Sequence, residues 1–191
     1  MSPVRDITHG LYAALRLAQF RKDGMQMFDI SVGGFWRSFL ALPISVALHV
    51  ASLMLPAMME PAQRTAAVLA TAGIAKLFTL LLPILAMLLI AKLINRSPRF
   101  SVFVIVFNWC GALLAALVFV AAILASLIVG SGFEEVPIIF ALIYSLAFTW
   151  YQLRESFEAD ILLTFLLLLV VILVQELVDY GVSAAIGFLA A

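Results

Sequence analysis

Residues 81–120 have the sequence LLPILAMLLIAKLINRSPRFSVFVIVFNWCGALLAALVFV, two long apolar runs separated by a short basic turn. An α-helix rises 1.5 Å per residue and needs about 20 apolar residues to cross roughly 30 Å of hydrocarbon. Each run reaches that length when it is followed outward into the neighbouring sequence, and the turn between them holds Arg96 and Arg99. This stretch therefore predicts a helical hairpin that crosses a membrane twice.

The rest of the chain has the same character. Of its 191 residues, 65% are hydrophobic and 12% are charged, whereas soluble domains contain about 45–50% apolar residues. The length criterion gives five spans, near residues 39–58, 72–94, 102–129, 136–153 and 161–180. We therefore predict an all-α, polytopic integral membrane protein, with a five-helix transmembrane domain over residues 35–191 that follows an N-terminal lead over residues 1–34.

The lead contains a predicted amphipathic helix over residues 3–20. Its apolar residues fall at helical spacing, namely Val4, Ile7, Leu11, Leu15 and Ala18. Arg5 and Arg16 lie off that stripe. Two positions for the helix are open: it rests in the headgroup layer with its apolar side down, or it packs on the protein's own membrane domain.

Two prolines lie inside predicted spans. Pro43 falls in the first span and Pro83 in the second. Because proline lacks a backbone N–H and clashes with the carbonyl one turn earlier, we expect a local kink at each.

The basic residues orient the spans, because Lys and Arg in short loops stay on the cytoplasmic side. One set of loops is basic, and it holds Arg5, Arg16, Arg21, Lys22, Arg37, Lys92, Arg96, Arg99 and Arg154. We therefore expect a cytoplasmic N-terminus and an external C-terminus. Interfacial anchors are then predicted at the inner boundary, namely Trp36, Arg37, Trp109, Trp150 and Tyr151.

Ionisable residues within spans are rare and are therefore the first candidates for a site. Counting along the spans places Glu176 and Lys76 each about 6 Å below the outer boundary, with Asp179 at the surface. Three arrangements are open for Lys76: it pairs with Glu176 and fixes the packing of two helices, it snorkels to the headgroups, or it lines an outward-facing cavity with Glu176 and Asp179.

His49 is predicted about 16 Å from the inner boundary, near the middle of the first span. A structural hydrogen bond is the simpler interpretation, and a proton relay would require a partner such as Glu176. Asn108 and Tyr144 are expected to form hydrogen bonds between helices.

The stretch MFDISVGGFWRSFLALP, residues 27–43, joins the lead to the first span. Asp29 and Ser31 are expected to cap a helix start, and Gly33 and Gly34 to allow a sharp change of direction. With five spans after a short lead, this join resembles small bacterial inner-membrane proteins of unknown function and, more distantly, the Yip1 family. Members of that family carry Asp-Leu-x-Gly-Pro before the first span, and here Asp29, Ile30 and Gly33 correspond, with the glycine displaced and no proline. The resemblance implies a multi-pass protein of the bacterial inner (plasma) membrane.

The sequence contains none of the common catalytic, phosphate-binding or metal-binding motifs, and its single cysteine, Cys110, lies in an apolar run. We therefore expect no enzymatic activity and no cofactor or metal. The chain carries 11 basic and 11 acidic residues, and this balanced charge gives no reason to expect a nucleic-acid partner.

The expected partners are the lipid bilayer and either another membrane protein or further copies of the chain. The first functional hypothesis is a scaffold, assembly factor or membrane-organising subunit, and the alternative is a small oligomeric transporter or channel that uses Glu176, Asp179, Lys76 and His49.

Overall fold

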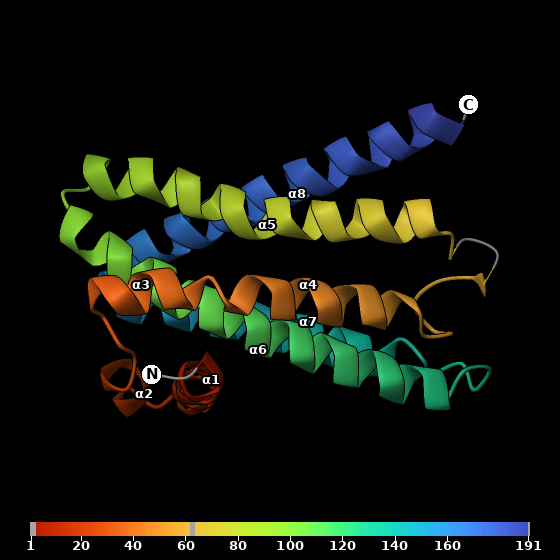
Figure 1. The fold of residues 1–191 in the computed structure, drawn as a ribbon, viewed down its shortest axis with the longest axis horizontal. Coiled ribbons are helices and arrows are strands. Elements are labelled where there is room, and N and C mark those ends of the chain that lie inside the picture. The colour runs from red at the N-terminus through yellow and green to blue at the C-terminus, as the bar shows by residue number, and fades with distance from the viewer. Residues whose placement is uncertain (1–2, 62–63, 191) are drawn as a thin grey trace.

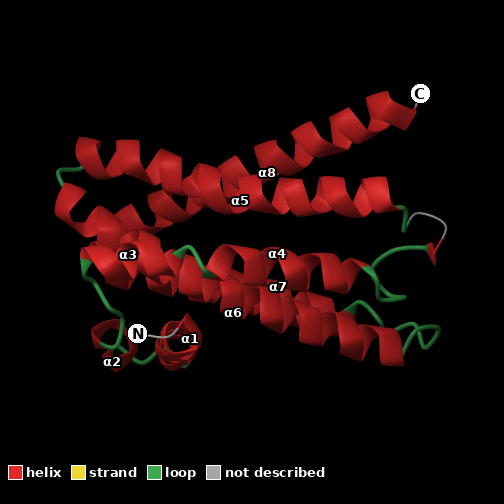
Figure 2. Ribbon diagram, in the orientation of Figure 1, coloured by secondary structure: helices red, strands yellow, loops and turns green. Residues whose placement is uncertain are grey.

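A computed structural model describes residues 3–61 and 64–190, with the side chains of the last helix described as far as Val182. Figure 2 shows helices joined by loops, and no strand occurs in these ranges. In chain order the elements are α1 (Pro3–Ala18), α2 (Asp23–Gln26), α3 (Val32–Ser38), α4 (Ala41–Leu53), α5 (Ala66–Leu93), the 3-10 turn η2 (Ser97–Arg99), α6 (Phe100–Leu127), α7 (Val136–Phe157) and α8 (Ile161–Ala190). Five helical segments of the described chain are long and apolar enough to cross a membrane, which agrees with the predicted all-α bundle.

The first of these segments consists of two helices, α3 and α4, and it runs from Val32 to Leu53. The two helices are separated by a short turn at Phe39 and Leu40. That turn lies one helical turn before Pro43, where the missing N–H and the proline ring interrupt the hydrogen-bond ladder. The helix is thus interrupted where a kink at Pro43 was predicted, and the segment begins and ends earlier than the predicted 39–58.

Among the other segments, α5 and α8 differ most from their predicted bounds. Helix α5 begins at Ala66, whereas the span was predicted from residue 72, and it continues through Pro83 without a break. Helix α8 extends to Ala190, beyond the predicted end at residue 180. The sequence rule counts only the residues that are needed to cross the hydrocarbon, whereas a helix continues until a residue or a contact ends it.

Helix α6 is the centre of the bundle. It packs against α3, α4, α5 and α7, and α8 packs against α5 and α7. Figure 1 shows the long helices running side by side between two sets of loops, with α8 diverging from α5 toward its C-terminal end. We call the end that holds η2 and the α7–α8 connection the basic end, because Arg96 and Arg99 lie there.

Helix α1 lies across the bundle and packs on α6; Figure 1 shows it nearly end-on while the long helices run across the view. A fully buried face made of Ala13, Ala14 and Leu17 forms this contact. Gly10 permits the close approach, because a Cβ atom there would lie 2.3 Å from the Trp109 ring. Of the two positions left open for this helix, packing on the protein's own bundle is therefore observed.

The apolar stripe predicted for α1 coincides only in part with the face of α1 that is buried. Ile7 and Leu11 pack against the core, but Val4 and Leu15 are exposed. The stripe was predicted from the large apolar residues, whereas close packing against α6 requires small residues, and these lie on the adjacent face of α1. The exposed apolar residues leave α1 with a second side suited to lipid.

Candidate functional site

Two adjoining cavities lie within the bundle. The first, of about 470 Å³, lies between α4, α5 and α8 and reaches the end opposite the basic end at Met59 and Val68; we call it the mouth cavity. The second, of about 250 Å³, lies further inside and is lined by residues of α4, α5, α6, α7 and α8; we call it the central cavity. His49, Lys76 and Gln175 line both cavities, so the two adjoin at these side chains.

The structure brings all four intramembrane candidates together, because His49, Lys76, Glu176 and Asp179 all line the mouth cavity. On α8, residues 175, 176 and 179 share a face because helical neighbours are three or four positions apart. Lys76 and Thr79 share a face of α5 for the same reason. Three separate helices thus present polar side chains to one space.

Lys76 makes no ion pair with Glu176, Asp179 or any other carboxylate of the described chain. Of the arrangements open from the sequence, the observed one is a shared cavity rather than a closed structural pair. Glu176 and Asp179 are exposed and Lys76 is half-buried. Opposite charges therefore face the same space without neutralising each other by direct contact.

The helix bounds also change where these residues lie along their helices. His49 is four residues from the end of α4, a rise of about 6 Å, whereas the prediction placed it in the middle of its span. Lys76 is ten residues from the start of α5, about 15 Å along the axis rather than about 6 Å. Both residues line one cavity, although counting from the predicted spans had put them at different depths.

Gln152 is a site residue that the sequence reasoning did not single out. It lines the central cavity, it is 2% exposed, and its side-chain oxygen Oε1 has no hydrogen-bond partner within the described chain. A buried acceptor without a partner is costly, and a bound donor would remove that cost. The available signal was an amide inside an apolar run, and Gln175 carries the same signal on α8.

The basic end of the central cavity is closed by a packed cluster. Phe103 lies between Phe107 and Phe157, with ring centroids 5.2 Å and 5.1 Å away, and Met87 and Leu153 are fully buried beside them. The polar surface therefore runs from the mouth to Gln152 and stops at an aromatic and aliphatic barrier.

The predicted interfacial anchors divide into two groups. Trp36 is 67% exposed, and Trp150 is half-buried with the Arg154 guanidinium 5.4 Å from its ring. Trp109 and Tyr151 are buried, the first under Gly10 of α1 and the second with its hydroxyl donating to the Phe20 carbonyl at 3.1 Å. Trp109 and Tyr151 therefore hold the lead on the bundle rather than facing outward. The depth of all the predicted anchors in a bilayer stays a prediction.

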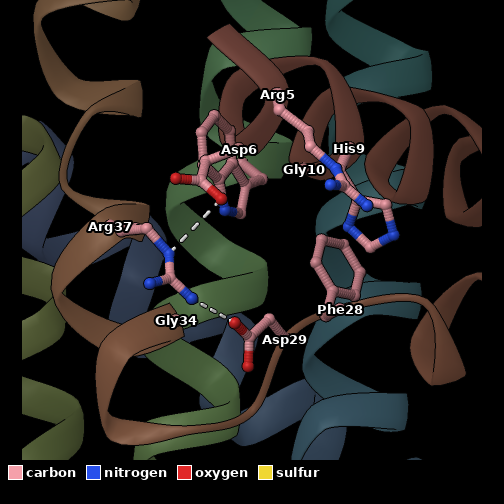
Figure 3. A pocket seen from close by; sticks show the side chains of 9 residues that line it. Arg5, Asp6, His9, Gly10, Phe28, Asp29, Gly34 and Arg37 are labelled. Carbon is pink, nitrogen blue, oxygen red and sulfur yellow. Dashed lines mark hydrogen bonds and ion pairs between the residues drawn. The ribbon is translucent and has the colours of Figure 1, made fainter. Parts of the chain in front are cut away.

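Arg37, the remaining anchor, is held by two carboxylates. It pairs with Asp29 and with Asp6 of α1, whose Oδ1 lies 3.5 Å from the Arg37 Nε (Figure 3). The two predicted interhelical hydrogen bonds are confirmed, because Asn108 donates to Ser38 Oγ at 2.9 Å and the Tyr144 hydroxyl donates to the Ala18 carbonyl.

No family model matches the chain, and neither the curated proteins nor the solved structures contain a match. The resemblance to the Yip1 family stays a prediction.

Proposed function

We propose that this protein is a multi-pass membrane protein that carries ions or a small polar solute through the mouth and central cavities. The observation that carries the proposal is the convergence of His49, Lys76, Glu176 and Asp179 on one cavity. The sequence alone favoured a scaffold, because a closed Lys76–Glu176 pair would have explained both residues structurally. Charges that share a space without pairing favour the transport alternative instead.

The two ends of the polar surface suggest how transport begins. Glu176 and Asp179 are exposed at the mouth, and Gln152 offers an unpartnered acceptor at the far end of the central cavity. The packed cluster of Phe103, Phe107 and Phe157 closes the basic end. With the predicted orientation, in a bacterial inner membrane with a cytoplasmic N-terminus, this is an outward-open, inward-closed arrangement, and passage requires movement of the aromatic cluster.

The test is flux into liposomes that contain the purified protein. Proton, potassium and chloride movements are followed separately with entrapped indicators, against protein-free liposomes. Lys76→Gln and Glu176→Gln are expected to lower the flux of the transported ion severalfold, because each removes a charge from the mouth cavity.

Two matched variants serve as controls. Lys92→Gln removes an exposed lysine from the same helix as Lys76, and Glu135→Gln removes an exposed carboxylate outside the mouth and central cavities. Both are expected to keep wild-type flux. If none of the three ions crosses faster than in protein-free liposomes, or if all four variants behave alike, the transport proposal is wrong for these ions.

A scaffold remains the second candidate because of one surface feature. An apolar groove of about 610 Å³ lies between α5 and α8, where α8 diverges, and Phe78, Leu85 and Leu177 are among its exposed lining residues. A groove of this kind fits the helix of a membrane partner or of a second copy. Crosslinking from Leu85→Cys in native membranes, with Cys110 replaced, would give a discrete adduct under this function and only diffuse products otherwise.

A further inference from the structure

A separate pocket of about 260 Å³ lies between α1, the segment before α3, α3 itself and α6. Figure 3 shows its side chains, with Arg5, Asp6 and His9 reaching in from α1, and with Asp29 and Arg37 on the opposite wall. None of its residues lines the mouth or central cavity. We call it the α1–α3 pocket.

The pocket contains side chains of both charges, and they differ in whether they form ion pairs. Arg37 is engaged by both Asp6 and Asp29. Arg5, in contrast, makes no ion pair or side-chain hydrogen bond with any described residue, although it lines the same pocket. The pocket therefore offers a free guanidinium from α1, whereas Asp6 of α1 and Asp29 of the facing segment share a single arginine, Arg37.

The remaining walls are aromatic and apolar. Phe28 and Trp109 line the pocket and are almost fully buried. Aromatic faces attract cations, and an indole N–H can donate a hydrogen bond. The walls thus suit a ligand that carries an ammonium group as well as an anionic group.

The surroundings of the pocket point to a lipid. Val4 of α1, and Val32 and Trp36 of α3, are exposed apolar side chains within a few residues of the pocket's charged groups. Because these residues are close in the chain to the charged groups of the pocket, they offer apolar surface for acyl chains, as a lipid requires and a soluble metabolite does not.

We propose that the α1–α3 pocket binds the zwitterionic phosphoethanolamine headgroup of a membrane lipid. The phosphate lies against Arg5 and His9, and the ammonium lies toward Asp29 and the aromatic walls. A guanidinium is suited to phosphate because its N–H groups donate charge-assisted hydrogen bonds in a fixed geometry. The lipid would fasten α1 to α3 from the membrane side.

The test measures binding of soluble short-chain lipids to purified, delipidated protein through the fluorescence of Trp109, in a background of Trp36→Phe and Trp150→Phe. Dihexanoyl phosphatidylethanolamine is compared with the phosphatidylcholine and phosphatidylglycerol of the same chain length, and with glycerophosphoethanolamine, which has no acyl chains. We expect saturable binding of the ethanolamine lipid. Arg5→Gln is expected to weaken it about tenfold, the effect of losing a charge-assisted hydrogen bond.

Arg21→Gln is the matched control, because it also removes one positive charge from the lead, but at an exposed site that pairs with Asp23 outside the pocket. Arg21→Gln should bind the ethanolamine lipid like the parent protein.

Equal binding of all three lipids, or equal effects of the two arginine variants, would overturn the proposal. If glycerophosphoethanolamine binds as tightly as the lipid, the ligand is a free phosphoester and the lipid assignment is wrong. The melting temperature of each variant is measured in parallel, so that a folding defect is recognised as such.

Discussion

At the scale of single residues, the join between the lead and the first span has strict geometric requirements. Ser31 Oγ accepts a hydrogen bond from the Gly34 N–H at 3.0 Å, and the Ser31 N–H donates to Asp29 Oδ1 at 3.0 Å. The predicted capping by Asp29 and Ser31 is therefore confirmed. Gly34 is needed for close approach, because a Cβ atom there would lie 1.9 Å from the Asp29 carbonyl oxygen.

The two adjacent glycines provide a matched pair of variants. Gly34→Ala is expected to lower the free energy of unfolding by about 1–3 kcal/mol, because the backbone of Asp29 must move to relieve the overlap. Gly33→Ala places its Cβ 3.1 Å from Nη1 of Arg37, a side-chain end that can shift by a few tenths of an ångström where a backbone atom cannot, so it should change stability by no more than about 0.5 kcal/mol. Denaturant unfolding in detergent measures both. Equal losses of stability in the two variants would show that the close approach of Gly34 to the Asp29 carbonyl is not the reason that a larger residue is unfavourable there.

Asp29 also predicts a dependence of stability on pH. Hydrogen bonds from Ser31, together with the Arg37 guanidinium, hold the pKa of the Asp29 carboxyl below its ordinary value of 3.8. The stability that these contacts contribute is complete above the unfolded-state pKa and is lost as the pH falls through the lowered folded-state pKa. Between about pH 5 and about pH 2, the wild-type protein should therefore lose more stability than Asp29→Asn.

The measurement is the unfolding midpoint as a function of pH, with Glu135→Gln as the control for loss of an exposed carboxylate. Identical pH profiles for wild type and Asp29→Asn would contradict the assignment.

At the scale of elements, the end of α1 is fastened by two tyrosines of α7. The Tyr144 hydroxyl donates to the Ala18 carbonyl and the Tyr151 hydroxyl donates to the Phe20 carbonyl. The last carbonyls of a helix lack partners within the helix, so hydrogen bonds from another element satisfy them. Lys22 adds a contact to Glu155 of α7 at 3.6 Å.

Removing these hydroxyls should loosen the lead. Tyr144→Phe and Tyr151→Phe are each expected to lower stability by about 1 kcal/mol, the usual net contribution of one hydrogen bond. Trypsin should also cleave faster after Arg21 and Lys22, both exposed in the turn that follows α1. Tyr180→Phe, which removes an exposed hydroxyl of α8, is the control and should leave the cleavage rate unchanged. An unchanged rate in the α7 variants would mean that the apolar contact with α6 alone holds α1.

At the scale of the whole molecule, the arrangement of loops at two ends predicts a defined topology in the membrane. Ser131 lies in the connection between α6 and α7, and Glu158 lies in the connection between α7 and α8 at the basic end; both are exposed. With the buried Cys110 replaced by alanine, Ser131→Cys should react with an impermeant maleimide added outside intact cells. Glu158→Cys should react only after the membrane is opened. The reverse pattern would overturn the predicted orientation.

The sequence by itself determined the number and approximate positions of the five long apolar helices, because hydropathy and the thickness of a bilayer act on each segment separately. It also identified the capped start of α3 and the break before Pro43, which depend on nearby residues alone. Tertiary structure decided which side chains are buried and which of them lie together. The burial of Trp109 and Tyr151 depends on α1 crossing the bundle, and the common cavity of His49, Lys76, Glu176 and Asp179 depends on how α4, α5 and α8 are rotated about their axes. Those rotations follow from side-chain packing between helices distant in sequence, and no local pattern of residues specifies them.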